Sequence, residues 1–259
     1  MRKAVAPPRE AANRRPVKVG AATGRVTTRS VHPHEAAAVA ALRASLPFSR
    51  AAKATREALA RESSTEDFAS GDCVLHPGTP RTTVDVVSRG RVRVDRGDGD
   101  DAMPVGYRGA HEVLDEASFG VAGRYEVGAY ALEPVTLLRV PIAAVRRAEA
   151  EDNALGAAVF TLLVARRRET EDRAESLLFR TVEGRLAELL VQVAARWGVP
   201  SPRGSLISIP LTHLEIARLI GSTRETVTLT IGSLRRAGLL DVAGRRIIVR
   251  DAAALSARG

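Results

Sequence analysis

Two neighbouring residues, Arg224 and Glu225, carry the clearest chemistry in this chain, and they directly follow the hydroxyl residues Ser222 and Thr223. An arginine can donate two hydrogen bonds to O6 and N7 of guanine, and a glutamate can accept one from N4 of cytosine. Hydroxyls at the start of a helix can bind phosphate oxygens. This order of residue types predicts a surface that reads the major groove of DNA.

The surrounding stretch predicts two short helices joined by a tight turn. Thr212 and Glu215 form a capping-box pattern, which marks the start of a helix, and Gly221 permits the turn after it. The second helix begins with a second possible capping box, from Ser222 to Glu225. The apolar faces of the two helices are Ile216, Leu219 and Ile220, and Val227, Ile231 and Leu234. The pattern predicts a helix-turn-helix, and "LLDVAGRRIIVRD" adds a two-stranded wing.

This helix-turn-helix pattern favours DNA reading over two ordinary interpretations of the same residues. In the first, Glu225 only completes the helix cap; in the second, Arg224 is a solvated surface arginine. The residues expected to contact DNA are Thr212, Ser222, Thr223, Arg224, Glu225, Thr228, Arg235 and Arg236.

The stretch "LTHLEIARLIGSTRETVTLTIGSLRRAGLL" closely resembles the DNA-binding domain of the cyclic-AMP receptor protein / fumarate–nitrate regulator (CRP/FNR) superfamily. The likeness covers about residues 68–255 and implies an α+β fold: an N-terminal β-roll of the cyclic-nucleotide-binding, jelly-roll kind, a long dimerisation helix and a C-terminal winged helix-turn-helix. By this resemblance, Arg224 and Glu225 read the guanine and the cytosine of a TGTGA-like half-site. Leu229 stands where the cyclic-AMP-responsive branch has an arginine, and leucine cannot donate to guanine, so readout of that base is expected to be relaxed or altered.

The resemblance implies a homodimeric, sequence-specific transcription regulator and not an enzyme. Its expected partners are double-stranded DNA and a second copy of the chain, with RNA polymerase as a further candidate. Turn signals and periodicity divide the chain into a disordered basic tail at 1–30, a sensor-like β-roll domain with flanking helices at 31–150, a long dimerisation helix at 151–180 and the winged helix-turn-helix at 181–259.

The long helix carries one apolar stripe, which has two possible partners. The stripe consists of Leu155, Val159, Leu162 and Leu163. A narrow stripe on a long helix is typical of packing against a second helix from a twofold-related chain, and the alternative is packing on its own domain.

In nucleotide-binding members of the superfamily, the β-roll carries a Gly-Glu-x-Ala turn and, further on, Arg-Ser/Thr-Ala. By resemblance the first motif falls on Asp115–Ser118, where Glu116 is kept, and the second on Tyr125–Val127, or from Arg124 onward after a shift of one residue. Glu116 and Arg124 are therefore the expected ligand-binding residues of a degenerate pocket. Asp115 and Glu126 would add carboxylates near a phosphate, so DNA binding is expected to be independent of cyclic AMP.

Other ligands and a second class of function remain open. The single cysteine, Cys73, excludes an iron–sulfur cluster within one chain, whereas haem or a metal would have to use Cys73, His76, His32 or His34. The alternative function is a metal-dependent, cupin-like β-barrel enzyme with an appended helical domain, for which the strands offer only His76 and His111. A regulator switched by another small ligand is the third candidate. No cofactor and no metal are expected.

The net charge of +9 is concentrated at the two ends of the chain. Residues 1–30 carry eight Arg or Lys against one Glu, and residues 201–259 carry nine basic against four acidic residues, so both ends could meet a polyanion. The sequence shows no apolar run of membrane-spanning length and no secretory signal. A cytoplasmic protein without a membrane partner is therefore expected.

Overall fold

The computed structural model describes residues 35–97, 102–120, 123–244 and 246–258. The predicted basic tail and the two histidines His32 and His34 lie outside the described residues. Within the described ranges, no helix has the length and apolar character needed to cross a membrane.

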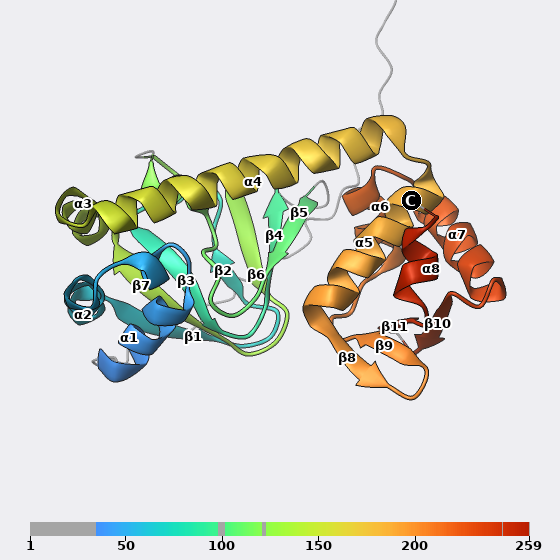
Figure 1. Cartoon of the computed structure of the whole chain (residues 1–259), viewed down its shortest axis with the longest axis horizontal. Helices are drawn as coiled ribbons and strands as arrows, with labels where there is room; N and C mark the ends of the chain where they lie inside the picture. The colour runs from blue at the N-terminus through green and yellow to red at the C-terminus, as the bar shows by residue number, and fades with distance from the viewer. Residues whose placement is uncertain (1–34, 98–101, 121–122, 245, 259) are drawn as a thin grey trace, which may run out of the picture. The chain divides into compact units, whose positions relative to one another are not determined.

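Figure 1 shows the order of the elements along the chain. The helices are α1 (Glu35–Ala44), α2 (Lys53–Glu62), α3 (Ile142–Glu151), α4 (Asn153–Phe179), α5 (Val182–Trp197), α6 (His213–Ile220), α7 (Arg224–Arg236) and α8 (Ala252–Ser256), with the short 3-10 helices η1 (Phe48–Arg50) and η3 (Glu116–Phe119). The strands are β1 (Ser64–Phe68), β2 (Cys73–Leu75), β3 (Thr83–Arg89), β4 (Val92–Arg96), β5 (Met103–Arg108), β6 (Val127–Ala131), β7 (Val135–Pro141), β8 (Gly198–Ser201), β9 (Gly204–Ile207), β10 (Leu240–Ala243) and β11 (Arg246–Val249).

The N-terminal β-rich region consists of two antiparallel sheets, ordered β1-β7-β3 and β2-β6-β4-β5. Val92 and Val94 alternate with arginines along β4, which pairs with β5 in an antiparallel hairpin from Val92↔Arg108 to Arg96↔Met103. Inward-facing side chains such as Val87 and Leu137, both fully buried, form the core of this region. Together with α4 and the C-terminal helix-turn-helix, these sheets confirm the predicted fold class.

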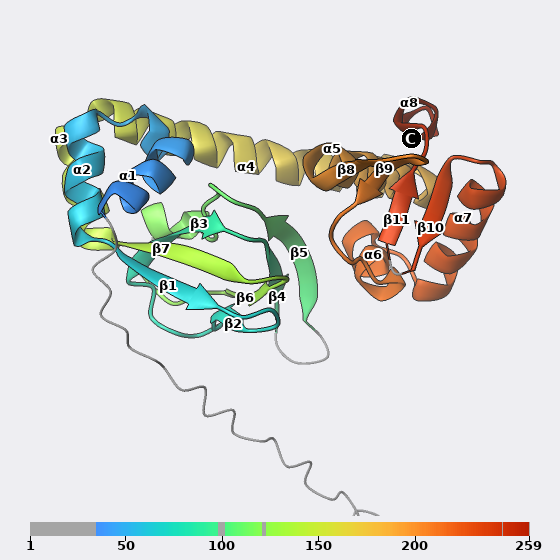
Figure 2. The same ribbon diagram turned by 90° about the horizontal axis from the view of Figure 1, so that it is seen from below.

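A second core lies where α1, α2, α3 and the first half of α4 cover the β1-β7-β3 sheet (Figure 2). Leu155 and Val159 of α4 belong to this core, at 0% and 7% exposure, and Leu162 packs against it. Of the two partners considered for the stripe, a second copy of the helix is therefore wrong for these residues, because the chain's own domain covers them. Periodicity identified a buried face of the helix but could not tell that the chain's own domain covers it.

The apolar side chains that α4 leaves exposed lie elsewhere on the helix. They are Phe160, Leu163, Leu177, Leu178 and Phe179. Phe160 is 69% exposed, and the last two residues are 75% and 81% exposed, which leaves a large apolar area on α4 without a partner in the described part of this chain.

The C-terminal core combines α5, α6 and α7 with a sheet ordered β10-β11-β9-β8. The predicted wing is confirmed as the antiparallel pair β10 and β11, from Leu240↔Val249 to Ala243↔Arg246. The stretch "SPRGS" forms the turn and the flanking ends of a hairpin between β8 and β9. β9 then pairs with β11, so the wing is one edge of a four-stranded sheet.

Candidate functional site

The turn between α6 and α7 is fixed by local backbone chemistry. The predicted capping box is confirmed: Glu215 N–H donates to Thr212 Oγ1 at 3.1 Å, and Thr212 N–H donates to Glu215 Oε2 at 2.8 Å. Gly221 adopts a left-handed conformation at φ 63°, which residues with a Cβ seldom adopt. A Cβ at Gly221 would also lie 2.8 Å from Leu177 Cδ2, the end of a flexible side chain that can move, so the glycine is required here for its conformation.

The cap of α7 differs from the prediction. The structure shows Thr223 as N-cap, because its Oγ1 accepts from Thr226 N–H at 3.1 Å, so the predicted cap from Ser222 to Glu225 is wrong. The two adjacent hydroxyl residues satisfy the same sequence pattern, and only the backbone conformation distinguishes them. Since Thr223 provides the cap, the Glu225 carboxylate is not required for it.

Arg224 and Glu225 are both exposed on the first turn of α7. Among the described residues, neither side chain has a hydrogen bond or an ion pair. Val227, Ile231 and Leu234 anchor the opposite face of the helix, at 0%, 4% and 1% exposure. The helix therefore presents a cation and an anion to solvent from a rigid, buried base.

The other predicted DNA contacts fall into two groups. Thr212, Thr223 and Thr228 are exposed, and Ser222 is half-buried, around the N-terminal ends of α6 and α7. The hydroxyl of Thr228 lies 2.8 Å from His213 Nδ1, which ties the first turn of α6 to α7. The remaining two residues, Arg235 and Arg236, are exposed at the last turn of α7, about 17 Å along the helix axis from its start.

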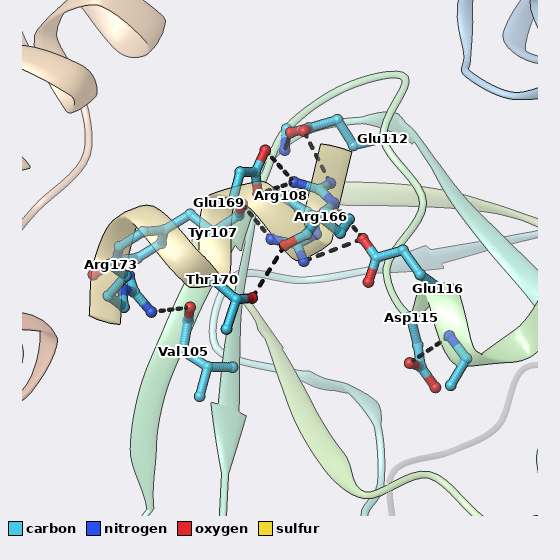
Figure 3. A network of polar contacts seen from close by, with 12 residues as sticks. Val105, Tyr107, Arg108, Glu112, Asp115, Glu116, Arg166, Glu169, Thr170 and Arg173 are labelled. Carbon is cyan, nitrogen blue, oxygen red and sulfur yellow. Dashed lines mark hydrogen bonds and ion pairs between the residues drawn. The ribbon is translucent and has the colours of Figure 1, made fainter. Parts of the chain in front are cut away.

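A second candidate site is a cavity of about 800 Å³ beside β5 and η3. Its charged lining comes mainly from α4, α5, β5 and η3, and consists of Arg96, Arg108, Asp115, Glu116, Arg166, Glu169, Asp172, Arg173, Arg185, Glu188 and Arg196. Figure 3 shows that Arg166 of α4 contacts the β-roll carboxylate Glu116, and that Arg173 of α4 contacts the backbone carbonyl of Val105.

Glu116 lies between two arginines at one end of this cavity. Its Oε1 accepts from Arg166 Nε at 2.6 Å and from Arg108 Nη2 at 3.3 Å (Figure 3). Arg166 also pairs with Glu169 at 2.7 Å and with Glu112 at 3.6 Å. Burial works to lower the pKa of Arg166, but Glu116 and Glu169 outweigh it and raise that pKa. These four carboxylate contacts hold two guanidinium groups in place.

Compared with Arg166, the guanidinium groups of Arg108 and Arg173 are compensated less completely. Burial lowers the pKa of Arg108, and its Nε is buried without a partner among the described residues. Burial also lowers the pKa of Arg173, whose Nη1 donates at 2.8 Å to the neutral carbonyl of Val105. The cavity therefore holds positive charge that its own carboxylates do not fully balance.

The structure places the two carboxylates expected to repel a phosphate differently from the prediction. Asp115 caps η3 by accepting from Ala117 N–H at 3.2 Å, and its other oxygen accepts from the buried Arg81 at 2.9 Å. Glu126 is 76% exposed, does not line the cavity and lies 3.6 Å from Arg96. The charge argument from the sequence therefore fails, because Arg81 compensates Asp115 and Glu126 lies elsewhere.

Of the two expected ligand-binding residues, the structure brings Glu116 into the cavity but not Arg124. Arg124 is exposed, and its Nη1 donates to the carbonyl of Gly78 at 2.5 Å. Sequence reasoning missed Arg108 and Arg166, which hold Glu116 from 8 and 50 residues away. Only Arg108 carries a sequence signal, as an arginine at the end of an alternating strand.

Of the residues considered for haem or a metal, only Cys73 and His76 lie in the described ranges, and they belong to no group that could hold a metal ion. Cys73 is half-buried and its thiol contacts the carbonyl of Leu75 at 3.0 Å, while burial raises the pKa of this thiol. In the described ranges, no three His, Cys, Asp or Glu side chains are grouped so that they could hold a metal ion.

The comparisons with known proteins match both halves of the chain. The family model of the cyclic nucleotide-binding domain matches residues 65–152, and that of the Crp-like helix-turn-helix domain matches residues 184–258. The chain is 32% identical over 194 residues to a global nitrogen regulator of Synechococcus elongatus, covering 74% of this chain and 87% of the relative. It is 26% identical over 203 residues to a CRP-like cAMP-activated global transcriptional regulator of Mycobacterium tuberculosis, covering 78% and 90%.

A solved structure gives the same architecture. A CooA mutant from Carboxydothermus hydrogenoformans matches with a TM-score of 0.62 at 25% identity, covering 76% of this chain and 88% of that one. The family is one of regulators, which rules out the cupin-like enzyme considered from the sequence. The chain belongs to the CRP/FNR family of helix-turn-helix transcription regulators.

Proposed function

We propose that the chain is a homodimeric regulator that reads TGTGA-like palindromic half-sites through Arg224 and Glu225, independently of cyclic AMP. It would act in the cytoplasm, where it meets DNA, with RNA polymerase as a candidate further partner. The observation that carries the proposal is the first turn of α7, where both side chains are exposed and unpaired among the described residues, above a cap that Thr223 provides.

Base readout follows from the chemistry of these two side chains. The guanidinium of Arg224 can donate to O6 and N7 of one guanine, and the Glu225 carboxylate can accept from N4 of cytosine. Both stand at the N-terminus of a helix, whose partial positive charge favours a nearby phosphate backbone. The half-buried hydroxyl of Ser222, just before this turn, could donate to that backbone without reading sequence, whereas the hydroxyls of Thr212 and Thr228 already donate to Glu215 and to the Arg224 carbonyl.

The homodimer is supported by the exposed apolar side chains of α4. Phe160, Leu178 and Phe179 are 69%, 75% and 81% exposed, and a second copy of α4 would cover them. In a C₂ dimer each copy presents its own α7, so we expect two half-sites with centres about 10 bp apart. Phe160→Glu should shift the sedimentation coefficient towards the monomer, whereas an unchanged dimer would show that Phe160 lies outside the interface.

Independence from cyclic AMP is supported by the state of the cavity arginines. A cyclic phosphate needs arginine donors, but Arg166 is already engaged by Glu116 and Glu169 at 2.6 and 2.7 Å. A phosphate would have to displace these carboxylates, and it would gain little from exchanging one anion for another.

In vitro selection of DNA by the full-length chain tests the proposal, followed by titrations with and without cyclic AMP. We expect a palindrome with a guanine and a cytosine at fixed positions, bound in nucleotide-free buffer. Failure to enrich any sequence would contradict DNA reading. A large gain in affinity on adding cyclic AMP, matched by micromolar binding in calorimetry, would contradict only the independence from the nucleotide.

A second candidate is a regulator switched by a small organic anion in the same cavity. The unpartnered Nε of Arg108 and the lowered pKa of Arg173 favour it, because an added anion would supply the missing charge compensation. Thermal unfolding with a panel of small carboxylates and phosphates would detect such a ligand through a raised Tm. The matched Arg108→Gln variant should lose that shift.

A further inference from the structure

The reading face of α7 carries one large apolar side chain among polar neighbours. In α7, which is described throughout, Leu229 is 74% exposed, whereas Val227, Ile231 and Leu234 are buried in the core. Single exposed apolar residues are common on protein surfaces, so exposure alone says little. The position of Leu229 on α7, on the same face as Glu225, is more informative.

Leu229 follows Glu225 by one helical turn on the same face. The two are four positions apart, which on a helix of 3.6 residues per turn brings their side chains into neighbouring positions about 6 Å apart along the axis. If Glu225 touches a base edge in the major groove, Leu229 reaches one that is fewer than two base-pair steps away. The inference therefore rests on the DNA readout proposed above.

The other exposed residue at this level, Thr228, cannot donate to a base. Its hydroxyl donates to the carbonyl of Arg224 at 2.8 Å and also lies 2.8 Å from His213 Nδ1. A hydroxyl has one proton, and the Arg224 carbonyl takes it, so His213 Nδ1 is the donor in the second bond. Thr228 could therefore only accept from a base, and Leu229 is the apolar side chain that meets a base edge at this turn.

Base chemistry then narrows the partner of Leu229. In the major groove, guanine, adenine and cytosine present hydrogen-bonding groups, whereas thymine adds an apolar C5 methyl. A leucine over a polar edge would cover donors or acceptors without satisfying them, which is unfavourable. We propose that Leu229 is a specificity-determining residue that selects thymine through its methyl group, at the base pair next to the one read by Glu225.

The test removes one methyl group from the DNA. After selection of the best site with the full-length protein, each thymine of one half-site is replaced in turn by uracil, which lacks only the C5 methyl. We expect one replacement to weaken binding about fourfold, and the others to have little effect. In Leu229→Ala, the same replacement should have no effect. Leu214→Ala, which truncates an exposed leucine of α6, is the matched control and should keep the fourfold response.

A second variant tests whether the residue at position 229 determines the preferred base. Leu229→Arg should change the preferred base from thymine to guanine, with a discrimination of roughly 5- to 150-fold, since a bidentate arginine–guanine pair has that effect. The inference is overturned if no thymine responds to uracil, or if Leu229→Ala responds as strongly as the native chain. Arg224→Ala separates the two proposals: loss of base preference in this variant supports readout by α7 even if the thymine contact fails.

Discussion

The start of α7 and the cavity beside η3 use the same residue types in opposite settings. Arg224 and Glu225 are neighbours in sequence, yet both are exposed and unpaired in the described part of the chain. In the cavity, Glu116 is 17% exposed and paired with Arg108 and Arg166, which come from other elements. One region keeps its charges available to a partner, and the other uses most of its charges to hold the elements together.

This difference explains why charge alone does not identify a binding residue. An exposed, unpaired side chain on a buried base loses little when a base edge replaces water, because no internal contact has to break. A paired side chain must first give up its partner, so a ligand in the cavity has to compete with Glu116 and Glu169. Removing one charge should therefore damage stability in the cavity region and DNA binding in the α7 region.

Removal of Asp115 should have the largest effect and should act on stability. Asp115→Ala leaves the guanidinium of Arg81, whose side chain is 4% exposed, without this carboxylate. Breaking a buried pair costs about 3–5 kcal/mol, and we expect the lower end, because Arg81 also donates to the carbonyl of Arg124. Urea unfolding of the full chain measures the loss.

Two controls separate charge from position in that experiment. Asp115→Asn has a single amide oxygen, which can keep either the cap of η3 or the contact with Arg81, so a smaller loss than in the alanine variant is expected. Glu225→Ala removes an exposed carboxylate from α7 and should change the free energy of unfolding by no more than about 0.5 kcal/mol. Equal losses for Asp115→Ala and Glu225→Ala would contradict the contrast between the regions.

Arg224→Ala should show the opposite pattern, with intact stability and impaired binding. We expect a loss of about 1–3 kcal/mol on the best site and a flattened preference at one guanine, since the bidentate contact disappears. Arg235→Ala, at the far end of α7, is the control and should weaken binding uniformly across sequences if it touches phosphate. Unchanged affinity and base preference in Arg224→Ala would show that Arg224 is not a reader.

The sequence predicted contacts between residues that are close along the chain, and it missed contacts between distant residues. The capping box of Thr212 and Glu215, the turn at Gly221 and the wing depend on residues close in sequence, and all three were predicted. The partners of Glu116 lie 8 and 50 residues away, and no local pattern reveals which arginine faces which carboxylate. Arg124 shows the same limit, because the β-roll fold was predictable but the direction of one loop side chain was not.

Replacing each of the two hydroxyl residues before α7 by alanine tests which of them caps the helix. We expect a smaller change in the free energy of unfolding than for Asp115→Ala. Thr223→Ala removes the acceptor of the Thr226 N–H and should cost about 1 kcal/mol in thermal or urea unfolding. Ser222→Ala leaves that bond in place and should cost clearly less. A larger loss for Ser222→Ala than for Thr223→Ala would return the cap to the residue predicted from the sequence.

The smallest effect should come from an exposed pair of the β-roll, and it should depend on pH. Glu133 accepts two hydrogen bonds from Arg91, at 2.8 and 2.6 Å, and these bonds are the main reason that its pKa is lowered. A lowered folded-state pKa means that the pair stabilises the fold above the unfolded-state pKa of about 4.3, and that this stability is lost as the pH falls through the folded-state value. Because the Glu133 side chain is 37% exposed, solvent screening limits the cost of Glu133→Gln at pH 7 to about 0.5 kcal/mol.

The difference in unfolding free energy between Glu133→Gln and the native chain should shrink below pH 4. In an Arg91→Gln background this difference should be absent at every pH. A difference that persists at low pH would mean that packing of the Glu133 side chain, and not its charge, stabilises the fold.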